Sequence, residues 1–296
     1  MPDNYLENQV LGEIKPLKKK PKWWVIVIDV ILLVIFLAVL AVSSNVVYLS
    51  AKYGEPFYVS GASMYPTLNS NGFRYNKSTD SYTPLTWNIG DNGDGDIVDY
   101  GWAKSKEKGN WKADLHRYDI VIVYYPSDYT DKTYSTLNAS ASLKIKRLIA
   151  FPGETIKFEN DPAYNPVWGK TTITHEDGTS EVLPNLYTLD DFPDLPDGTK
   201  YYIEGRSTVT KTTIEAKLKD DEYFVMGDNR IGAHSDDSRN VGPLKDNMIQ
   251  GKAYVLTGMR KLAYVQKEDG TIVKEPKFLL NKIRMPWDYI SLEYKA

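Results

Sequence analysis

The sequence has no cysteine, only three histidines among its 296 residues, and a net charge of just −3. Without cysteine there can be no disulfide framework, thiolate metal site or cysteine nucleophile. The small net negative charge gives no indication of a basic surface that could bind nucleic acid, so no nucleic-acid partner is expected. A composition of 42% hydrophobic and 25% charged residues is typical of a folded protein rather than a disordered chain. A cysteine-free chain also suits a domain exported to an oxidising compartment.

Charge is nearly missing from one long stretch close to the N-terminus. Residues 30–42 are wholly apolar, and with its flanks the stretch reaches the ~20 residues that a bilayer core requires. Trp23 and Trp24 at one end and Tyr48 at the other stand where aromatic belts lie. We therefore predict a membrane-spanning helix over residues 23–48. Asp29 is its one acidic residue, and we expect it to lie at the interface or to be neutral.

The orientation follows from five lysines within residues 1–22. By the positive-inside rule this basic tail is cytoplasmic, so that residues 49–296 form an extracytoplasmic domain. The alternative is a cleavable signal peptide, because Ala41-Val42-Ser43 has the small-x-small pattern of a cleavage site. The apolar run is longer than the 7–15 residues of a signal-peptide core, which favours an uncleaved anchor.

Beyond residue 49 the sequence predicts a mostly β domain. Short β-branched and aromatic runs predict strands at residues 55–60, 117–125, 142–151, 155–158, 208–216, 222–226 and 253–256. No long amphipathic helix follows the anchor, so we expect a single sheet system rather than βαβ units. Two segments rich in turn residues, 76–116 and 159–207, are predicted to be insertions.

Two short segments carry candidate chemistry. Ser63 lies in Ser60-Gly-Ala-Ser-Met-Tyr-Pro-Thr-Leu68, and Lys146 in Lys144-Ile-Lys-Arg-Leu-Ile-Ala-Phe-Pro-Gly153. A serine needs a base to become a nucleophile, and a lysine kept neutral by burial can be that base. The apolar strand around Lys146 favours such burial. A loop serine and a solvated edge-strand lysine are the alternative interpretations.

Four segments, residues 56–68, 117–126, 144–153 and 226–243, resemble the conserved motifs of bacterial type I signal peptidases, the Ser/Lys enzymes that remove signal peptides. The single anchor resembles the Gram-positive form. The resemblance implies that Ser63 is the nucleophile and Lys146 the general base. It also implies that Ser235 orients the lysine, that Asp237 and Arg239 form a supporting ion pair, and that Arg117 and Asp119 match the Arg-x-Asp motif.

The sequence departs from the family pattern at three places. Tyr118 stands where the family usually has glycine, and the gap between Arg230 and Ser235 is about two residues longer than usual. Gly61 stands where some members carry a serine that helps to bind the oxyanion. The backbone N–H of Ser63 can serve as one oxyanion donor, and the second donor is left open.

Substrate binding is expected to use β-augmentation, with an extended peptide pairing with the strands that lead to Ser63 and to Lys146. By resemblance, shallow apolar pockets for small side chains would be lined by Phe57, Val59, Met64, Ile122 and Ile145. Plain core packing is the alternative for each of these residues. No metal and no cofactor is implied.

The sequence thus predicts a membrane-anchored serine endopeptidase that removes N-terminal signal peptides from exported preproteins at the outer face of the cell membrane. Its expected partners are signal peptides and the lipid bilayer, with the secretion translocon as a further candidate. The alternatives are a non-catalytic assembly factor of the same fold and a self-cleaving Ser/Lys regulator. A Ser-His-Asp site using His234 is disfavoured, because Ser63 does not lie in a Gly-x-Ser-x-Gly elbow.

Overall fold

The structure of the protein is a computed structural model, and its contacts divide the chain into two units, residues 1–47 and 48–296. It describes residues 22–61, 63–69, 73–76, 81–84, 96–105, 114–159, 161, 164–165, 168–187, 213–230, 235–270 and 272–294. After the N-terminal helix nearly all of the described regular structure is β-strand, which confirms the predicted fold class.

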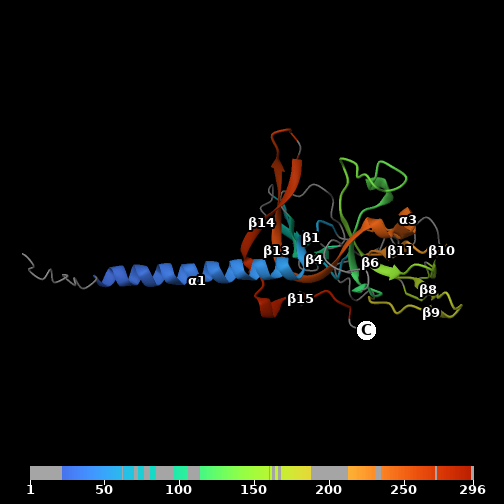
Figure 1. Cartoon of the computed structure of the whole chain (residues 1–296), viewed down its shortest axis with the longest axis horizontal. Coiled ribbons are helices and arrows are strands. Elements are labelled where there is room, and N and C mark those ends of the chain that lie inside the picture. The colour runs from blue at the N-terminus through green and yellow to red at the C-terminus, as the bar shows by residue number, and fades with distance from the viewer. Residues whose placement is uncertain are drawn as a thin grey trace, which may run out of the picture. The chain divides into compact units, whose positions relative to one another are not determined.

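The N-terminal helix α1 (Trp23–Lys52) is 30 residues long and is continuous (Figure 1). Its most apolar window of 18 residues has a mean hydropathy of 3.4, and none of that window is buried inside the protein. At 1.5 Å per residue the helix is about 45 Å long, which exceeds a hydrocarbon core of ~30 Å. α1 is therefore long and apolar enough to cross a membrane, and it confirms the predicted helix.

The larger of two sheets has eleven strands and contains both the strand that carries Lys146 and the strand that precedes the Ser63 segment. Its main path runs β12-β11-β6-β5-β13-β4-β2-β3, while β1 pairs with β4, and β14 and β15 pair with β13. All these pairs are antiparallel. The strands are β1 (Gly54–Tyr58), β2 (Phe73–Asn76), β3 (Ser81–Pro84), β4 (Asp96–Ser105), β5 (Ile120–Val123), β6 (Lys144–Ala150), β11 (Glu222–Met226), β12 (Leu244–Lys245), β13 (Ile249–Gln266), β14 (Ile272–Ile283) and β15 (Ile290–Ser291).

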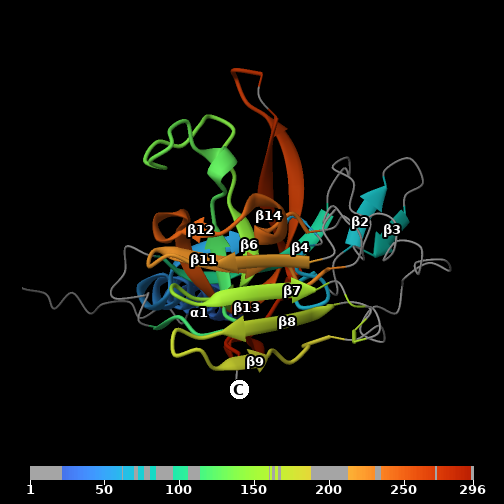
Figure 2. The ribbon, with the colours of Figure 1, turned by 90° about the vertical axis from the view of Figure 1, so that its right-hand side faces the viewer.

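A second sheet of four strands shows that the prediction of a single sheet system is wrong. It runs β10-β7-β8-β9, and Figure 2 shows β7, β8 and β9 side by side. Its strands are β7 (Thr155–Glu159), β8 (Lys170–Thr174), β9 (Ser180–Val182) and β10 (Thr213–Lys217). One face of this sheet is apolar, and Ile156, Phe158 and Ile173 pack there against Ile149 and Phe224 of the larger sheet. A separate sheet forms because alternating residues can bury one face against another sheet.

The strand predictions succeed best where apolar residues are continuous. The strand predicted at 222–226 is β11, and the strand predicted at 142–151 contains β6. β4, β8 and β9 instead lie inside the two segments predicted to be insertions, and β4 pairs with both β1 and β13. Their mixed polar composition hid these strands, because pairing with neighbouring strands stabilises a strand whose own residues show no clear pattern.

The loop that carries Ser63 rests on an apolar cluster at the end of β1. Val59, Met64 and Leu68 of this loop are all at most 2% exposed. They pack against residues of β5, β13 and the C-terminal segment, namely Ile120, Ala253, Leu256 and Leu292. The loop is thereby fixed to the sheet, although it contains no strand of its own.

Candidate active site

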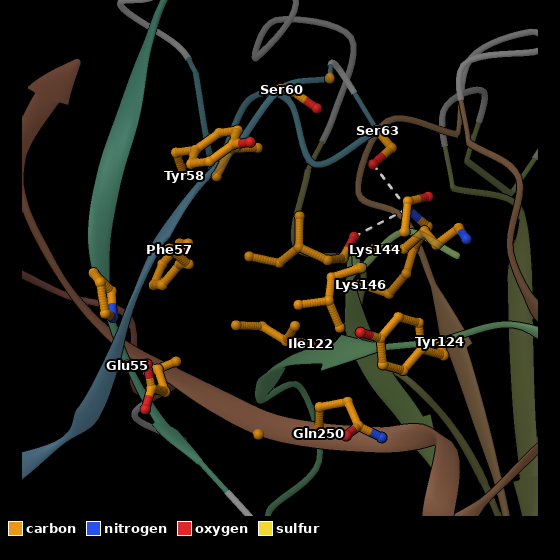
Figure 3. A pocket seen from close by; sticks show the side chains of 18 of the residues that line it. Glu55, Phe57, Tyr58, Ser60, Ser63, Ile122, Tyr124, Lys144, Lys146 and Gln250 are labelled. Atoms are coloured by element: carbon orange, nitrogen blue, oxygen red, sulfur yellow. Dashed lines mark hydrogen bonds between the residues drawn. The ribbon is translucent and has the colours of Figure 1, made fainter. Parts of the chain in front are cut away.

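Ser63 and Lys146 are brought together from distant parts of the chain. Lys146 lies on β6, and Ser63 lies in the turn that follows β1. The Nζ atom of Lys146 lies 2.9 Å from the Oγ atom of Ser63 and 3.0 Å from the carbonyl oxygen of Ile145 (Figure 3). Both contacts are at hydrogen-bonding distance. A serine and a candidate base therefore face each other directly.

The environment of Lys146 favours its neutral form. The residue is only 4% exposed, and burial lowers the pKa of its amine to about 8, against the upward pull of the Asp237 and Asp236 carboxylates. The cations of Lys144 and Arg239 lower the pKa further. With a pKa of about 8, roughly a tenth of the amines are neutral at pH 7, whereas an ordinary lysine is almost wholly protonated. The physical condition for a lysine base is thus met.

Ser235, Asp237 and Arg239 form one buried chain of hydrogen bonds. The hydroxyl of Ser235 donates to Asp237 Oδ2 at 2.7 Å, and the Arg239 guanidinium donates to both oxygens of that carboxylate at 2.8 Å. The predicted ion pair is present at 2.8 Å. The Ser235 hydroxyl bonds to Asp237 here and not to Lys146, within the part of the chain that the structure describes.

Gly227 lets this chain of hydrogen bonds approach the Ser63 loop. A Cβ atom at position 227 would lie 2.1 Å from Ser235 Oγ and 2.5 Å from the Ser63 carbonyl oxygen. Both distances are impossible for a real side chain, so only glycine fits between the two serines. The N–H of Gly227 also donates to Asp237 Oδ2 at 2.8 Å. The structure thereby places Ser235 close to the Ser63 loop.

A buried ion pair beside the dyad was not predicted from the sequence. Arg147 follows Lys146 on β6 and donates to the two oxygens of Asp228 at 2.6 and 2.5 Å. Thr67 also bonds to the Asp228 carboxylate, and the N–H of Asn229 donates to the Ser63 carbonyl at 3.0 Å. These contacts join β6 to the Ser63 loop. Asp228 lies within the motif segment 226–243, which was the one signal for it in the sequence.

Arg117 and Asp119 lie away from the reacting pair and brace the strands around it. The Arg117 guanidinium donates to the Ile149 carbonyl at 2.6 Å and to Glu154 at 2.7 Å. Asp119 is buried, with Lys252 Nζ 2.7 Å from its carboxylate. The Arg-x-Asp motif therefore secures the ends of β5 and β6 and does not contact Ser63.

A groove of about 760 Å³ leads to Ser63 and Lys146. Four of the five predicted pocket residues, Phe57, Val59, Ile122 and Ile145, line it, whereas Met64 is fully buried in the cluster beneath the loop. Polar side chains of Glu55, Tyr124 and Gln250 also line the groove, and Figure 3 shows Glu55 and Gln250 at the end away from Ser63. Glu55 and Gln250 make that end polar. It was not predicted, because exposed polar residues carry no spacing signal.

The wall formed by β1 depends on a second close approach. A Cβ atom at Gly101 of β4 would lie 2.2 Å from the Val255 carbonyl oxygen and 2.9 Å from the ring of Phe57. Phe57 is paired with Gly101 across β1 and β4, so the missing side chain leaves room for the ring. His234, the candidate base of the alternative site, lies outside the described residues, as does Ala62.

Comparisons with known proteins identify the family of the chain. A sequence model of the family described as "signal peptidase, peptidase S26" matches residues 27–257. The chain therefore belongs to the signal peptidase S26 family, and the resemblance to type I signal peptidases is confirmed. The predicted class of enzyme, a serine endopeptidase, is confirmed at the level of the family.

Relatives from Bacillus subtilis have similar sequences. Signal peptidase I V is 31% identical over 46% of this chain and 63% of its own length. Signal peptidase I U is 28% identical over 81% of this chain and 90% of its own length. A crystal structure of a signal peptidase I from Enterococcus faecalis V583 is 25% identical, covers 47% of this chain and 95% of its own, and has a TM-score of 0.26.

Proposed function

We propose that the protein is a membrane-anchored endopeptidase that removes N-terminal signal peptides from exported preproteins, with Ser63 as nucleophile and Lys146 as general base. The observation that carries the proposal is the distance of 2.9 Å between Lys146 Nζ and Ser63 Oγ. A second supporting observation is the lowered pKa of the buried Lys146 amine. Family membership supports the substrate class, since the relatives are named signal peptidase I.

The first chemical step transfers the hydroxyl proton of Ser63 to the neutral amine of Lys146 while Ser63 Oγ attacks the scissile carbonyl carbon. The oxyanion can accept a hydrogen bond from the backbone N–H of Ser63. The Lys146 ammonium then gives its proton to the leaving amine, and the peptide bond breaks to leave an ester on Ser63. In the second half, a water molecule loses a proton to Lys146 while its oxygen attacks the ester carbon. Lys146 then returns that proton to Ser63 Oγ as the ester bond breaks, which restores the Ser63 hydroxyl and the neutral amine and releases the new carboxylic acid.

Substrate placement follows from the groove. Among the described residues the segment 141–143 pairs with no strand, and it lines the groove and continues into β6. The N–H groups of Ala141 and Ser142 already donate to the Asn138 carbonyl oxygen and to Asp128 Oδ1, so an extended peptide beside this segment would donate to its carbonyl oxygens. Apolar side chains near the dyad, Phe57, Ile122 and Ile145, suit small apolar residues beside the cleaved bond. The polar end with Glu55 and Gln250 suits a residue that can form hydrogen bonds.

Location at the membrane is supported by α1 and by the basic residues that precede it. We propose that residues 1–22 lie in the cytoplasm and that the groove faces the outer side, where a preprotein emerges. Protease added to intact spheroplasts should then digest the part of the chain beyond Tyr48 and spare the N-terminal tail. Full protection of the C-terminal part would reject this orientation.

Cleavage of a purified preprotein is the direct test of the reaction. The full-length protein in detergent should release the signal peptide at one bond, identified by mass spectrometry. Ser63→Ala and Lys146→Met should each lower the rate by more than about a thousandfold, because a nucleophile and its base act as a unit. If the native protein binds preproteins but cuts none, the non-catalytic alternative is correct.

A further inference from the structure

The loop that carries Ser63 is closed at its neck by Asn69 and Asp99. We propose that these two residues are positioning residues, whose hydrogen bonds help to hold Ser63 in its place opposite Lys146. The inference rests on the proposed function for its kinetic consequences, and on five hydrogen bonds for its geometry. We call Val59, Gly61, Asn69 and Asp99 together the loop clamp.

Asp99, on β4, holds both ends of the loop. The chain enters the loop at Val59, whose N–H donates to the Asp99 carbonyl oxygen at 3.1 Å. The chain leaves the described part of the loop at Asn69, whose N–H donates to Asp99 Oδ2 at 2.7 Å. The Asp99 N–H in turn donates to Asn69 Oδ1 at 2.8 Å. One residue of a sheet strand therefore fixes the entry and the exit of the loop.

Asn69 closes the loop across its neck. Its side-chain Nδ2 donates to the carbonyl oxygens of Val59 at 2.8 Å and of Gly61 at 3.0 Å. Both donors and the acceptor of this amide are thus bonded inside the loop clamp. The side chain is fully buried, and its backbone has φ = 63°, a left-handed conformation that asparagine tolerates better than most residues. No shorter or apolar side chain could make these three bonds.

The loop clamp matters because Ser63 lies outside any strand or helix. Its position opposite Lys146 depends on contacts such as the bond from the Asn229 N–H to its carbonyl oxygen. A misplacement of about 1 Å between reacting groups can cost about a hundredfold in rate. The loop clamp touches neither Ser63 Oγ nor Lys146 Nζ, so its effect on the reaction must be indirect.

The role of Asp99 is that of an acceptor rather than of a charge. Burial raises the pKa of the Asp99 carboxyl, whereas the Asn69 N–H bond and the Arg284 guanidinium act to lower it. Because burial disfavours the charged form of the Asp99 carboxyl, a neutral amide oxygen can accept the same hydrogen bond in its place. Asparagine at position 99 should therefore keep the bond to the Asn69 N–H, and alanine should lose it.

Three variants of the full-length protein separate these roles. Asn69→Gly keeps the left-handed backbone without strain and removes only the side chain. Asp99→Ala removes the acceptor, and Asp99→Asn restores it. We expect kcat to fall at least tenfold in Asn69→Gly and Asp99→Ala, with KM changed less than threefold, and Asp99→Asn to stay within threefold of the native kcat.

A matched control excludes a general loss of stability. Leu244→Ala empties a fully buried position on β12, in an apolar cluster that contains no residue of the loop, and should keep native kcat when assayed well below its melting temperature. Hydrogen exchange gives a second readout: Asn69→Gly should speed exchange within residues 59–69 and leave β11 unchanged. Native kcat in Asn69→Gly, an equal loss in Leu244→Ala, or an Asp99→Asn variant as slow as Asp99→Ala would overturn the proposal.

The two proposals fail in different ways. If the native protein cleaves no preprotein, the proposed function is wrong, and hydrogen exchange still decides whether Asn69 and Asp99 hold the loop. If the native protein cleaves and Asn69→Gly cleaves equally fast, the loop clamp alone is wrong.

Discussion

Lys146 and Arg147 are neighbours on β6 and both are buried, yet they meet opposite partners. Lys146 Nζ lies 2.9 Å from the neutral hydroxyl of Ser63, whereas the Arg147 guanidinium lies 2.5 Å from the carboxylate of Asp228. Burial without a directly bound carboxylate lowers the pKa of the lysine, and the ion pair with Asp228 raises that of the arginine against the effect of burial. Alternation along one strand thus separates an amine of lowered pKa from a fixed cation.

The first prediction concerns the pH dependence of the rate. Only the neutral amine of Lys146 can take the Ser63 proton, and its pKa is lowered to about 8. We expect kcat/KM to fall tenfold per pH unit below about pH 8 and to level off above it, because kcat/KM reports the free enzyme. Steady-state cleavage of a signal-peptide substrate from pH 5 to pH 10 measures this.

A matched variant distinguishes the lysine from a histidine base. His234→Ala should leave the acidic limb in place, since the limb belongs to Lys146. Loss of that limb in His234→Ala, or a plateau already reached at pH 6.5, would assign the base to histidine instead.

The second prediction concerns the stability of the folded protein, which depends on pH through the same lowered pKa of Lys146. The folded pKa of Lys146 is below its unfolded value, so the unfolded chain binds more protons between the two pKa values and stability rises with pH. Below about pH 8 the folded protein carries a buried ammonium at a cost. Lys146→Met removes this cost, and the inactive variant should therefore melt at a higher temperature than the native protein at pH 7.

The difference between the two proteins gives the control. Above pH 10.5 both side chains are neutral, and the stability advantage of Lys146→Met should disappear there. Both proteins should be melted by calorimetry from pH 6 to pH 11. The difference between their melting temperatures removes the contribution of the other titrating groups, which the two proteins share. An advantage that does not change with pH would mean that better packing, and not charge, stabilises the methionine variant.

Much of the site could be predicted because it consists of short, contiguous motifs. Ser63 and Lys146 lie in segments whose residue types suggested a nucleophile and a base, whereas the pair of Asp237 and Arg239 was implied by the family resemblance. The apolar runs of β6 and β11 marked them as strands. The distances could not be predicted, because Ser63 and Lys146 are 83 positions apart and only the pairing of distant strands joins them.

The missed features share a physical reason as well. Met64 and Ile122 are equally apolar, so the pattern could not tell a core residue from a residue of the groove. Asp228, Asn69 and Asp99 are polar residues in turns or in a polar strand, where solvent exposure is the usual expectation. Their burial becomes evident only when each partner is seen, since a buried polar group needs its hydrogen bonds.

The third prediction tests the ion pair of Arg147 and Asp228. Asp228 is fully buried, so Asp228→Asn leaves the arginine cation without its partner and should cost about 3–5 kcal/mol of unfolding free energy. Arg147→Met should be similarly destabilising. Urea unfolding of the native protein, the two single variants and the double variant forms a double-mutant cycle.

The double variant carries the decisive result. Removing both charges leaves no unpaired ion, so its loss should be smaller than the sum of the single losses by at least about 2 kcal/mol. Additive losses within about 0.5 kcal/mol would show that the two charges do not depend on each other.

The fourth prediction concerns Tyr118, which stands where the family usually has glycine. Its backbone has φ = 71°, a left-handed conformation that costs a residue with a side chain about 1–2 kcal/mol. The ring offsets this cost: it is 3% exposed within the core, and its hydroxyl donates to the Pro184 carbonyl at 2.8 Å. The packing and hydrogen bond of the tyrosine side chain therefore compensate for a backbone conformation that glycine would adopt without strain.

Three substitutions at position 118 separate backbone from side chain. Tyr118→Phe loses one hydrogen bond and should cost about 1 kcal/mol. Tyr118→Ala loses the ring and keeps the strain, and should cost about 3–5 kcal/mol. Tyr118→Gly loses the same ring but relieves the strain, so it should be about 1 kcal/mol more stable than Tyr118→Ala, although glycine is ordinarily the less stable of the two. Urea unfolding of the three variants measures this order, and an alanine variant as stable as the glycine variant would contradict the account.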